Sequence, residues 1–143
     1  MITMVRRTVQ ARPVGENGTL ARGGYMELTY DPAFPYEVRL AETGGEAGEV
    51  VFARDLLRDA LEGTPAGEGL VQARLRTFRG VRHSMLQLVV PGADNAPLVF
   101  AFRDASVAEF VRDTTDLVPP GQEWRFLEDE VDDDLALFLG EAA

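Results

Sequence analysis

Hydrophobic and polar side chains alternate in short stretches of the first forty residues, which is the period of a β-strand with one buried face. In the clearest stretch, Met26, Leu28 and Tyr30 share one face. Residues 31–35 contain two prolines, which fix φ and remove ladder donors, so they predict a turn. Strands are therefore predicted at residues 2–11, 25–30 and 36–41.

Two continuous apolar runs, at residues 50–53 and 98–102, predict short strands buried on both faces. Each run leads into a segment with helical spacing. Asp104 and Ser106 are both candidate caps of the second helix, and Ser106 with Glu109 fits a capping box. The apolar helix positions are Leu56, Leu57, Ala60 and Leu61 within residues 54–62, then Val107, Phe110, Val111 and Thr114, and finally Val131, Leu135, Phe138 and Leu139. The order of strands and helices predicts an α+β fold.

The segment at residues 70–90 predicts a β-hairpin closed by a two-residue loop, Arg79-Gly80. In that register position 76 faces 83 and position 74 faces 85. Both strands then place apolar side chains on one face and polar side chains on the other. The apolar face holds Val71, Ala73, Leu75, Leu86 and Leu88, and the polar face holds Gln72, Arg74, Arg76, His83 and Gln87, with Met85.

A short internal similarity links the two halves of the chain. Residues 51–55 (Val-Phe-Ala-Arg-Asp) and 99–104 (Val-Phe-Ala-Phe-Arg-Asp) both stand where an apolar strand is expected to enter a helix. Duplication and coincidence explain so short a match equally well, and both interpretations stay open.

Charge is unevenly distributed along the 143 residues, which carry 14 basic side chains, all arginine, and 24 acidic ones, for a net charge of −10. Residues 113–143 hold ten acids and one base. Residues 69–93 hold no acid but include four arginines and the only histidine. We therefore expect one domain over residues 1–143, with a basic segment and an acidic C-terminal segment on a nearly neutral body.

The residue types exclude most catalytic chemistry. Without cysteine there are no disulfides, thiolate metal sites or cysteine nucleophiles. His83 is predicted on an exposed strand with no carboxylate nearby in sequence, so it does not indicate a catalytic triad. The acidic run at residues 128–134 is typical of a solvated, helix-capping segment and lacks the spacing of a calcium loop. We expect no enzymatic activity, no metal and no cofactor.

The sequence also gives expectations about location. No apolar run approaches the 18 residues of a membrane span. The N-terminal charges, Arg6 and Arg7, follow a very short apolar patch, whereas a signal peptide has the reverse order and a longer apolar region. These features predict a cytoplasmic protein.

The predicted basic surface is formed by Arg74, Arg76, Arg79 and Arg82. A merely solvated surface, docking of a protein partner, and contact with an acidic segment of a neighbouring subunit are all compatible with it. Nucleic acid is a weaker interpretation, since Phe78 is the only aromatic candidate for base stacking and the net charge opposes phosphate.

Several segments in order over about residues 25–125 resemble the SsgA-like family of sporulation and cell-division regulators. The matching residues are Tyr30, Asp31, Pro35, Tyr36, Val38, Phe52, Ala53, Arg54, Asp55, Leu56, Leu57, Gly67, Gly69, Val71, Phe110, Val118, Pro119, Pro120, Gly121 and Glu123. The chain departs from the family pattern at Val50, where a tryptophan is usual, and at residues 70–73, so it resembles a divergent member.

The resemblance implies a non-enzymatic regulator that positions or organises the tubulin-like protein FtsZ, directly or through a related recruiter, at sporulation septa. It implies two antiparallel β-sheet-plus-helix units in one domain, similar to the Whirly fold, and a homotrimer. The matching residues would be mainly structural. The alternative is a single-stranded nucleic-acid-binding module on the Whirly-like sheet.

Overall fold

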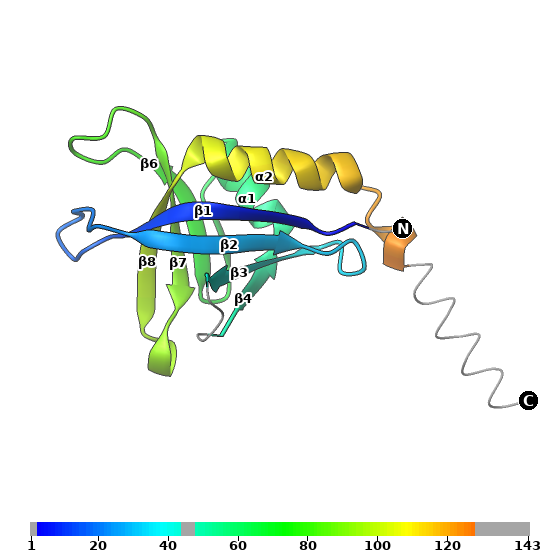
Figure 1. The fold of residues 1–143 in the computed structure, drawn as a ribbon, viewed down its shortest axis with the longest axis horizontal. Helices are drawn as coiled ribbons and strands as arrows, with labels where there is room; N and C mark the ends of the chain where they lie inside the picture. The colour runs from blue at the N-terminus through cyan, green and yellow to red at the C-terminus, as the bar shows by residue number, and fades with distance from the viewer. Residues whose placement is uncertain (1–2, 44–47, 128–143) are drawn as a thin grey trace, which may run out of the picture.

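The computed structural model describes residues 3–43 and 48–127. Figure 1 shows a strongly curved sheet with helices packed against it. The elements follow in the order β1 (Val5–Pro13), β2 (Gly24–Tyr30), β3 (Glu37–Glu42), β4 (Val50–Ala53), α1 (Arg54–Leu61), β5 (Ala66–Glu68), β6 (Val71–Arg76), β7 (Met85–Pro91), a 3₁₀ turn (Ala93–Asn95), β8 (Pro97–Arg103) and α2 (Asp104–Leu117). Residues 124–127 are helical as well.

All eight strands belong to one antiparallel sheet with the order β4-β3-β2-β1-β8-β7-β6-β5. Each half of the chain contributes four consecutive strands followed by one helix, and β1 pairs with β8 to join the halves. The α+β expectation with an antiparallel sheet is therefore confirmed. A duplication behind the two halves stays a prediction.

The alternating pattern places its apolar residues as predicted. Met26, Leu28 and Tyr30 on β2 are 8%, 2% and 0% exposed. Leu28 lies opposite Leu40 of β3, which is also buried. Since side chains alternate along a strand, these residues all face the same layer of the molecule.

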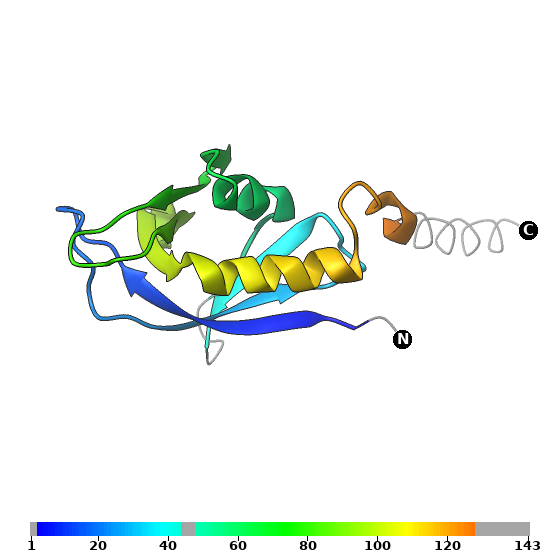
Figure 2. The ribbon, with the colours of Figure 1, turned by 90° about the horizontal axis from the view of Figure 1, so that it is seen from above.

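Both helices pack on one face of the sheet, as the view in Figure 2 makes plain. The predicted apolar positions of α1 and α2 are buried there, among them Leu57, Ala60, Val107 and Phe110. We call this the inner face of the sheet, and the opposite side its outer face.

The start of α2 corrects the predicted capping box. The helix begins at Asp104, directly after β8, so Ser106 lies inside its first turn. Asp104 Oδ2 accepts a hydrogen bond from the Ser84 hydroxyl at 2.5 Å, and Asp104 Oδ1 accepts one from the N–H of Ala105. Glu109 instead forms an ion pair with Arg7.

The apolar runs are not buried on both faces as predicted. Val51 is 44% exposed, because β4 is an edge strand and Val51 points away from the helices. Leu98, at the start of β8, is 47% exposed, and only Ala101 and Phe102 of that run are fully buried. A run without polar residues cannot reveal which of its faces the fold will cover.

The segment at residues 63–69, for which the sequence pattern predicts no strand, contains the short strand β5. Its three residues carry no apolar alternation, so the sequence pattern could not reveal it. The N–H of Ala53, the last residue of β4, donates to the carboxylate of Glu68, the last residue of β5, at 2.7 Å.

The hairpin exists, but its register is shifted by two residues. Arg76 lies opposite Met85 and Arg74 opposite Gln87, so the connection spans residues 77–84. Because side chains alternate with a period of two, a shift of two residues keeps every strand residue on its predicted face. His83, predicted on β7, lies instead in the loop.

The loop at residues 77–84 is longer because part of it folds back onto the outer face. Phe78 is 5% exposed and packs with Met85, Ala101 and Val81. The N–H of Val81 donates to the Phe78 carbonyl, which forms a turn around Gly80 at φ +80°. The free energy gained by burying the Phe78 ring outweighs the advantage of a shorter, two-residue connection.

The predicted C-terminal helix and the acidic run at residues 128–134 lie outside the described residues. Among the helices that the structure describes, none has the length and apolar character needed to cross a membrane.

Candidate functional site

Arg54 is the most completely buried charged residue of the described chain, at 1% exposure. It is placed there because α1 begins directly after the edge strand β4 and turns its first side chain inward, toward the end of α2. Its Nη1 donates to the carbonyls of Thr114 (3.1 Å) and Val118 (2.8 Å), and its Nη2 donates to Glu123 Oε1 at 2.8 Å. The guanidinium thereby satisfies two carbonyls at the C-terminal end of α2, one of them just past its last residue.

Glu123 is held in place from its own segment. The prolines at 119 and 120 end α2, and the N–H of Gly121 donates to both carboxylate oxygens of Glu123, at 3.0 and 3.2 Å. Glu123 is itself only 8% exposed. The buried pair of Arg54 and Glu123 therefore fixes the chain after α2 against the start of α1.

Tyr30 lies beneath the Arg54 guanidinium, with 5.0 Å between the guanidinium carbon and the ring centroid. The Tyr30 hydroxyl donates to the Pro35 carbonyl at 2.9 Å, and the backbone N–H of Arg54 donates to the Tyr36 carbonyl. Burial raises the pKa of Tyr30 to about 12, although the positive charge of Arg54 opposes the shift.

This raised pKa predicts a loss of stability in strong base. The unfolded tyrosine ionises near pH 10.0, whereas Tyr30 in the folded protein stays neutral until about pH 12. The free energy of unfolding should therefore fall as the pH rises from 10 to 12 and then level off. Urea unfolding across this range measures the fall. Tyr30→Phe should be less stable than the wild type near neutral pH, because the hydrogen bond to the Pro35 carbonyl is lost, but it should lack much of this fall. An identical fall in the variant would contradict the assignment.

Residues that carry the family resemblance gather in and around this cluster. Phe52, Leu56, Leu57 and Phe110 belong to the same hydrophobic core as Tyr30. Asp31 accepts a hydrogen bond from the N–H of Ala33 and shapes the turn before Pro35. Other matching residues have local roles. The N–H of Ala53 donates a hydrogen bond to Glu68, and Asp55 forms an ion pair with Arg58 at 2.8 Å. Gly69 lies in the turn between β5 and β6, and Pro119 is exposed after the end of α2.

The four predicted interaction arginines do not behave alike. Arg74 on β6 and Arg79 and Arg82 in the loop are exposed. Arg76 is partly buried, with its guanidinium carbon 4.7 Å from the Phe78 ring centroid and its Nη1 donating to Gln87 Oε1. Arg76 is therefore engaged within the molecule, whereas Arg74, Arg79 and Arg82 are exposed.

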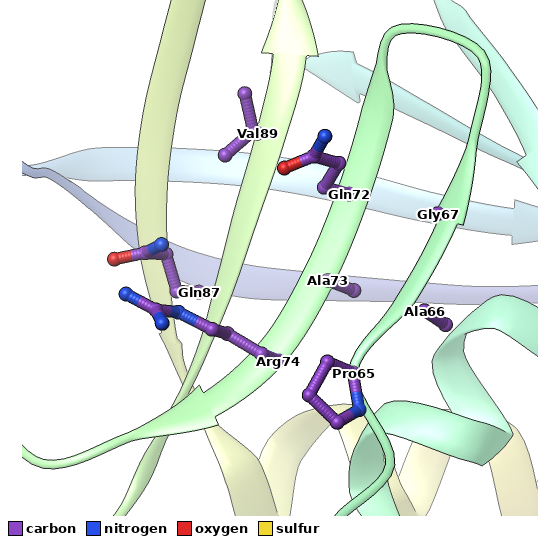
Figure 3. Close-up of a pocket in the computed structure, with 8 residues that line it drawn as sticks. All are labelled: Pro65, Ala66, Gly67, Gln72, Ala73, Arg74, Gln87 and Val89. Carbon is purple, nitrogen blue, oxygen red and sulfur yellow. The ribbon is translucent and has the colours of Figure 1, made fainter.

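Arg74 borders a shallow cavity of about 450 Å³ on the β5–β7 end of the sheet. Figure 3 shows Arg74 and Gln87 extending from neighbouring strands toward the same space, with Gln72 and Val89 farther along the same strands. Three of the eight lining residues have polar side chains, namely Gln72, Arg74 and Gln87.

A second hollow, of about 480 Å³, lies where β1 and β8 meet the loop at residues 77–84. We call it the basic groove. Sequence reasoning found Arg82 and His83 but missed Arg12 of β1 and Arg103 of β8, because no hydrophobic pattern reveals that the first and last strands pair. The groove is lined by Gln10, Arg12, Gly80, Val81, Arg82, His83, Met85 and Arg103.

Within residues 3–43 and 48–127, no group of three or more His, Asp or Glu side chains is placed to hold a metal ion. His83 is exposed in the loop, so it lacks the buried carboxylate partner that orients a catalytic histidine.

Comparison with known proteins gives a consistent family. Residues 25–123 match the family model described as Streptomyces sporulation and cell division protein, SsgA. The chain is 38% identical over 104 residues to the sporulation-specific cell division protein SsgB of Kineococcus radiotolerans. That match covers 71% of this chain and 61% of the relative, so the chain spans less than two thirds of the relative's length.

Two solved structures have a similar fold. One was determined in work stating that mutations in SsgB correlate to longitudinal cell division during sporulation of Streptomyces coelicolor. It is 29% identical, with a TM-score of 0.75 over 88% of this chain and 97% of that one. The SsgA-like sporulation-specific cell division protein from Thermobifida fusca has a TM-score of 0.77 over 96% of both chains, at 24% identity.

Proposed function

Because the chain belongs to the SsgA family of sporulation and cell division proteins, we propose that it is a non-enzymatic regulator of sporulation-specific cell division. Its task is to position or organise FtsZ, directly or through a related recruiter, at septum sites. The observation that carries this proposal is the family match over residues 25–123, together with an exposed, acid-free arginine surface on the hairpin.

The docking surface is assigned to Arg74, Arg79 and Arg82. These side chains extend from β6 and the following loop, with no acidic residue anywhere in residues 69–93 to neutralise them locally. Arginine is favoured at protein interfaces because its planar guanidinium binds carboxylates in two places at once. A complementary partner therefore presents carboxylates to this end of the sheet.

Charge reversal tests the placement. The triple variant Arg74→Glu, Arg79→Glu, Arg82→Glu should bind purified FtsZ at least about tenfold more weakly in biolayer interferometry, because attraction becomes repulsion. Arg76 is left unchanged, since its contacts with Phe78 and Gln87 are internal.

The matched control reverses three exposed arginines elsewhere, Arg6, Arg22 and Arg112, with the same change in net charge. Equal weakening by both triple variants would mean that only net charge matters, and unchanged binding by the first would refute the placement. In the native host, a tagged copy should form regularly spaced bands that coincide with FtsZ during sporulation.

The remaining expectations belong to the same proposal. The sequence itself predicts one domain over residues 1–143 and a cytoplasmic location, and the family resemblance implies a Whirly-like fold, a homotrimer and a place at septa. The single-stranded nucleic-acid alternative finds little support, because Phe78, its stacking candidate, is 5% exposed. Signal over the nucleoid, or single-strand binding that falls steeply with salt, would favour that alternative instead.

A further inference from the structure

The basic groove shares Arg82 with the docking surface proposed above, but its other lining residues are different. It lies on the outer face of the sheet, where Arg12 of β1 and Arg103 of β8 stand beside Arg82 and His83 of the loop. None of the eight described residues that line it is acidic. Three guanidinium groups around one hollow of about 480 Å³ suit a ligand with several closely spaced carboxylates.

The chain itself supplies such a ligand. Residues 128–134 read Glu-Asp-Glu-Val-Asp-Asp-Asp, which places six carboxylates within seven consecutive residues. No other stretch of this sequence has a comparable density of acids. We propose that the basic groove of one copy binds the acidic run at residues 128–134 of a second copy.

The position of the groove favours a second copy over the same chain. Arg103 lines the groove, and α2 begins at the next residue and runs for 14 residues, about 20 Å, away from it. Residues 118–127 continue beyond the far end of α2, as both Figure 1 and Figure 2 show. The acidic run of the same chain would have to return past the whole helix and around the sheet to its outer face.

Such a contact is heterologous, because the groove of one copy meets a different part of the next. Heterologous contacts form closed rings when the rotation between copies closes and open chains when it does not. This inference does not rest on FtsZ binding. Arg82 belongs to both surfaces, but Arg103 belongs to the groove alone, so an Arg103→Glu variant tests the groove without changing the docking arginines.

Engineered thiols test the contact in the full chain, which contains no cysteine of its own. One preparation carries His83→Cys in the groove, and a second preparation of different size carries Asp133→Cys in the acidic run. A short bis-maleimide should link the two chains at least about fivefold more than it links Asp133→Cys to the control Glu62→Cys, because binding raises the local thiol concentration. Glu62 is exposed after α1 and lies outside the groove.

Two further experiments test whether charge attraction brings the two thiols together. Adding Arg103→Glu to the His83→Cys chain should reduce the yield to that of the Glu62→Cys control. Salt at about 1 M should do the same, since the Debye length there is roughly 3 Å. Equal yields at positions 83 and 62 would overturn the proposal. A link that forms within single chains of the double variant His83→Cys, Asp133→Cys at low protein concentration would overturn the second copy as occupant.

Discussion

Replacing Arg54 by methionine is expected to lower the free energy of unfolding by about 3–5 kcal/mol. The substitution removes one partner of a buried ion pair and leaves Glu123 uncompensated at 8% exposure. It also leaves the carbonyls of Thr114 and Val118 without the donor that satisfies them. Urea denaturation followed by circular dichroism measures the change.

The control for this experiment lies one helical turn away. Arg58→Met removes an ion pair of similar length, with Asp55, but that carboxylate is largely exposed, so the loss should stay below about 0.5 kcal/mol. The double variant Arg54→Met, Glu123→Met should be more stable than Arg54→Met alone, because no buried charge is then left unpaired. A similar loss for Arg54→Met and Arg58→Met would contradict the central role given to Arg54.

A second large effect is expected from one added methyl group at Gly23. A Cβ built there would lie 1.8 Å from the carbonyl oxygen of Ala11 and 2.8 Å from the Cα of Arg12. Both are backbone atoms of β1, so neither can move aside without displacing the strand. Gly23→Ala should therefore destabilise the protein by about 3 kcal/mol, at or beyond the upper end of ordinary overpacking.

The adjacent glycine provides a matched control. A Cβ at Gly24 would have no atom within 4 Å, so Gly24→Ala should leave stability unchanged or raise it by a few tenths of a kcal/mol. Thermal unfolding of the two variants side by side makes the comparison. Equal melting temperatures would show that β1 and β2 can separate at this point without cost.

The parts of the fold that follow from local periodicity were predictable. The alternation that buries Met26 and Leu28 and the helical spacing that buries Val107 and Phe110 are properties of a few consecutive residues. The length of the hairpin loop was not predictable, because it depends on the burial of Phe78 against Ala101, a residue of another strand.

The functional surfaces were also predictable from the sequence only in part. The exposed arginines on β6 and its loop were apparent from an acid-free stretch of sequence. The basic groove was not, because Arg12 and Arg103 come together only when β1 pairs with β8. Arg54 and Glu123 could be singled out only through the family resemblance, since 69 residues separate them and nothing local marks either as buried.

The hydrogen bond from Ala53 to Glu68 has a consequence for how other proteins can bind this one. β4 and β5 are the two edges of the sheet, yet one short helix connects them, and the Glu68 carboxylate occupies a backbone donor of β4. The edges are also only four and three residues long. Strand addition needs a long row of free backbone groups. Partners are therefore expected to recognise side chains on the surface of the sheet, and an incoming β-strand should find no edge on which to extend it.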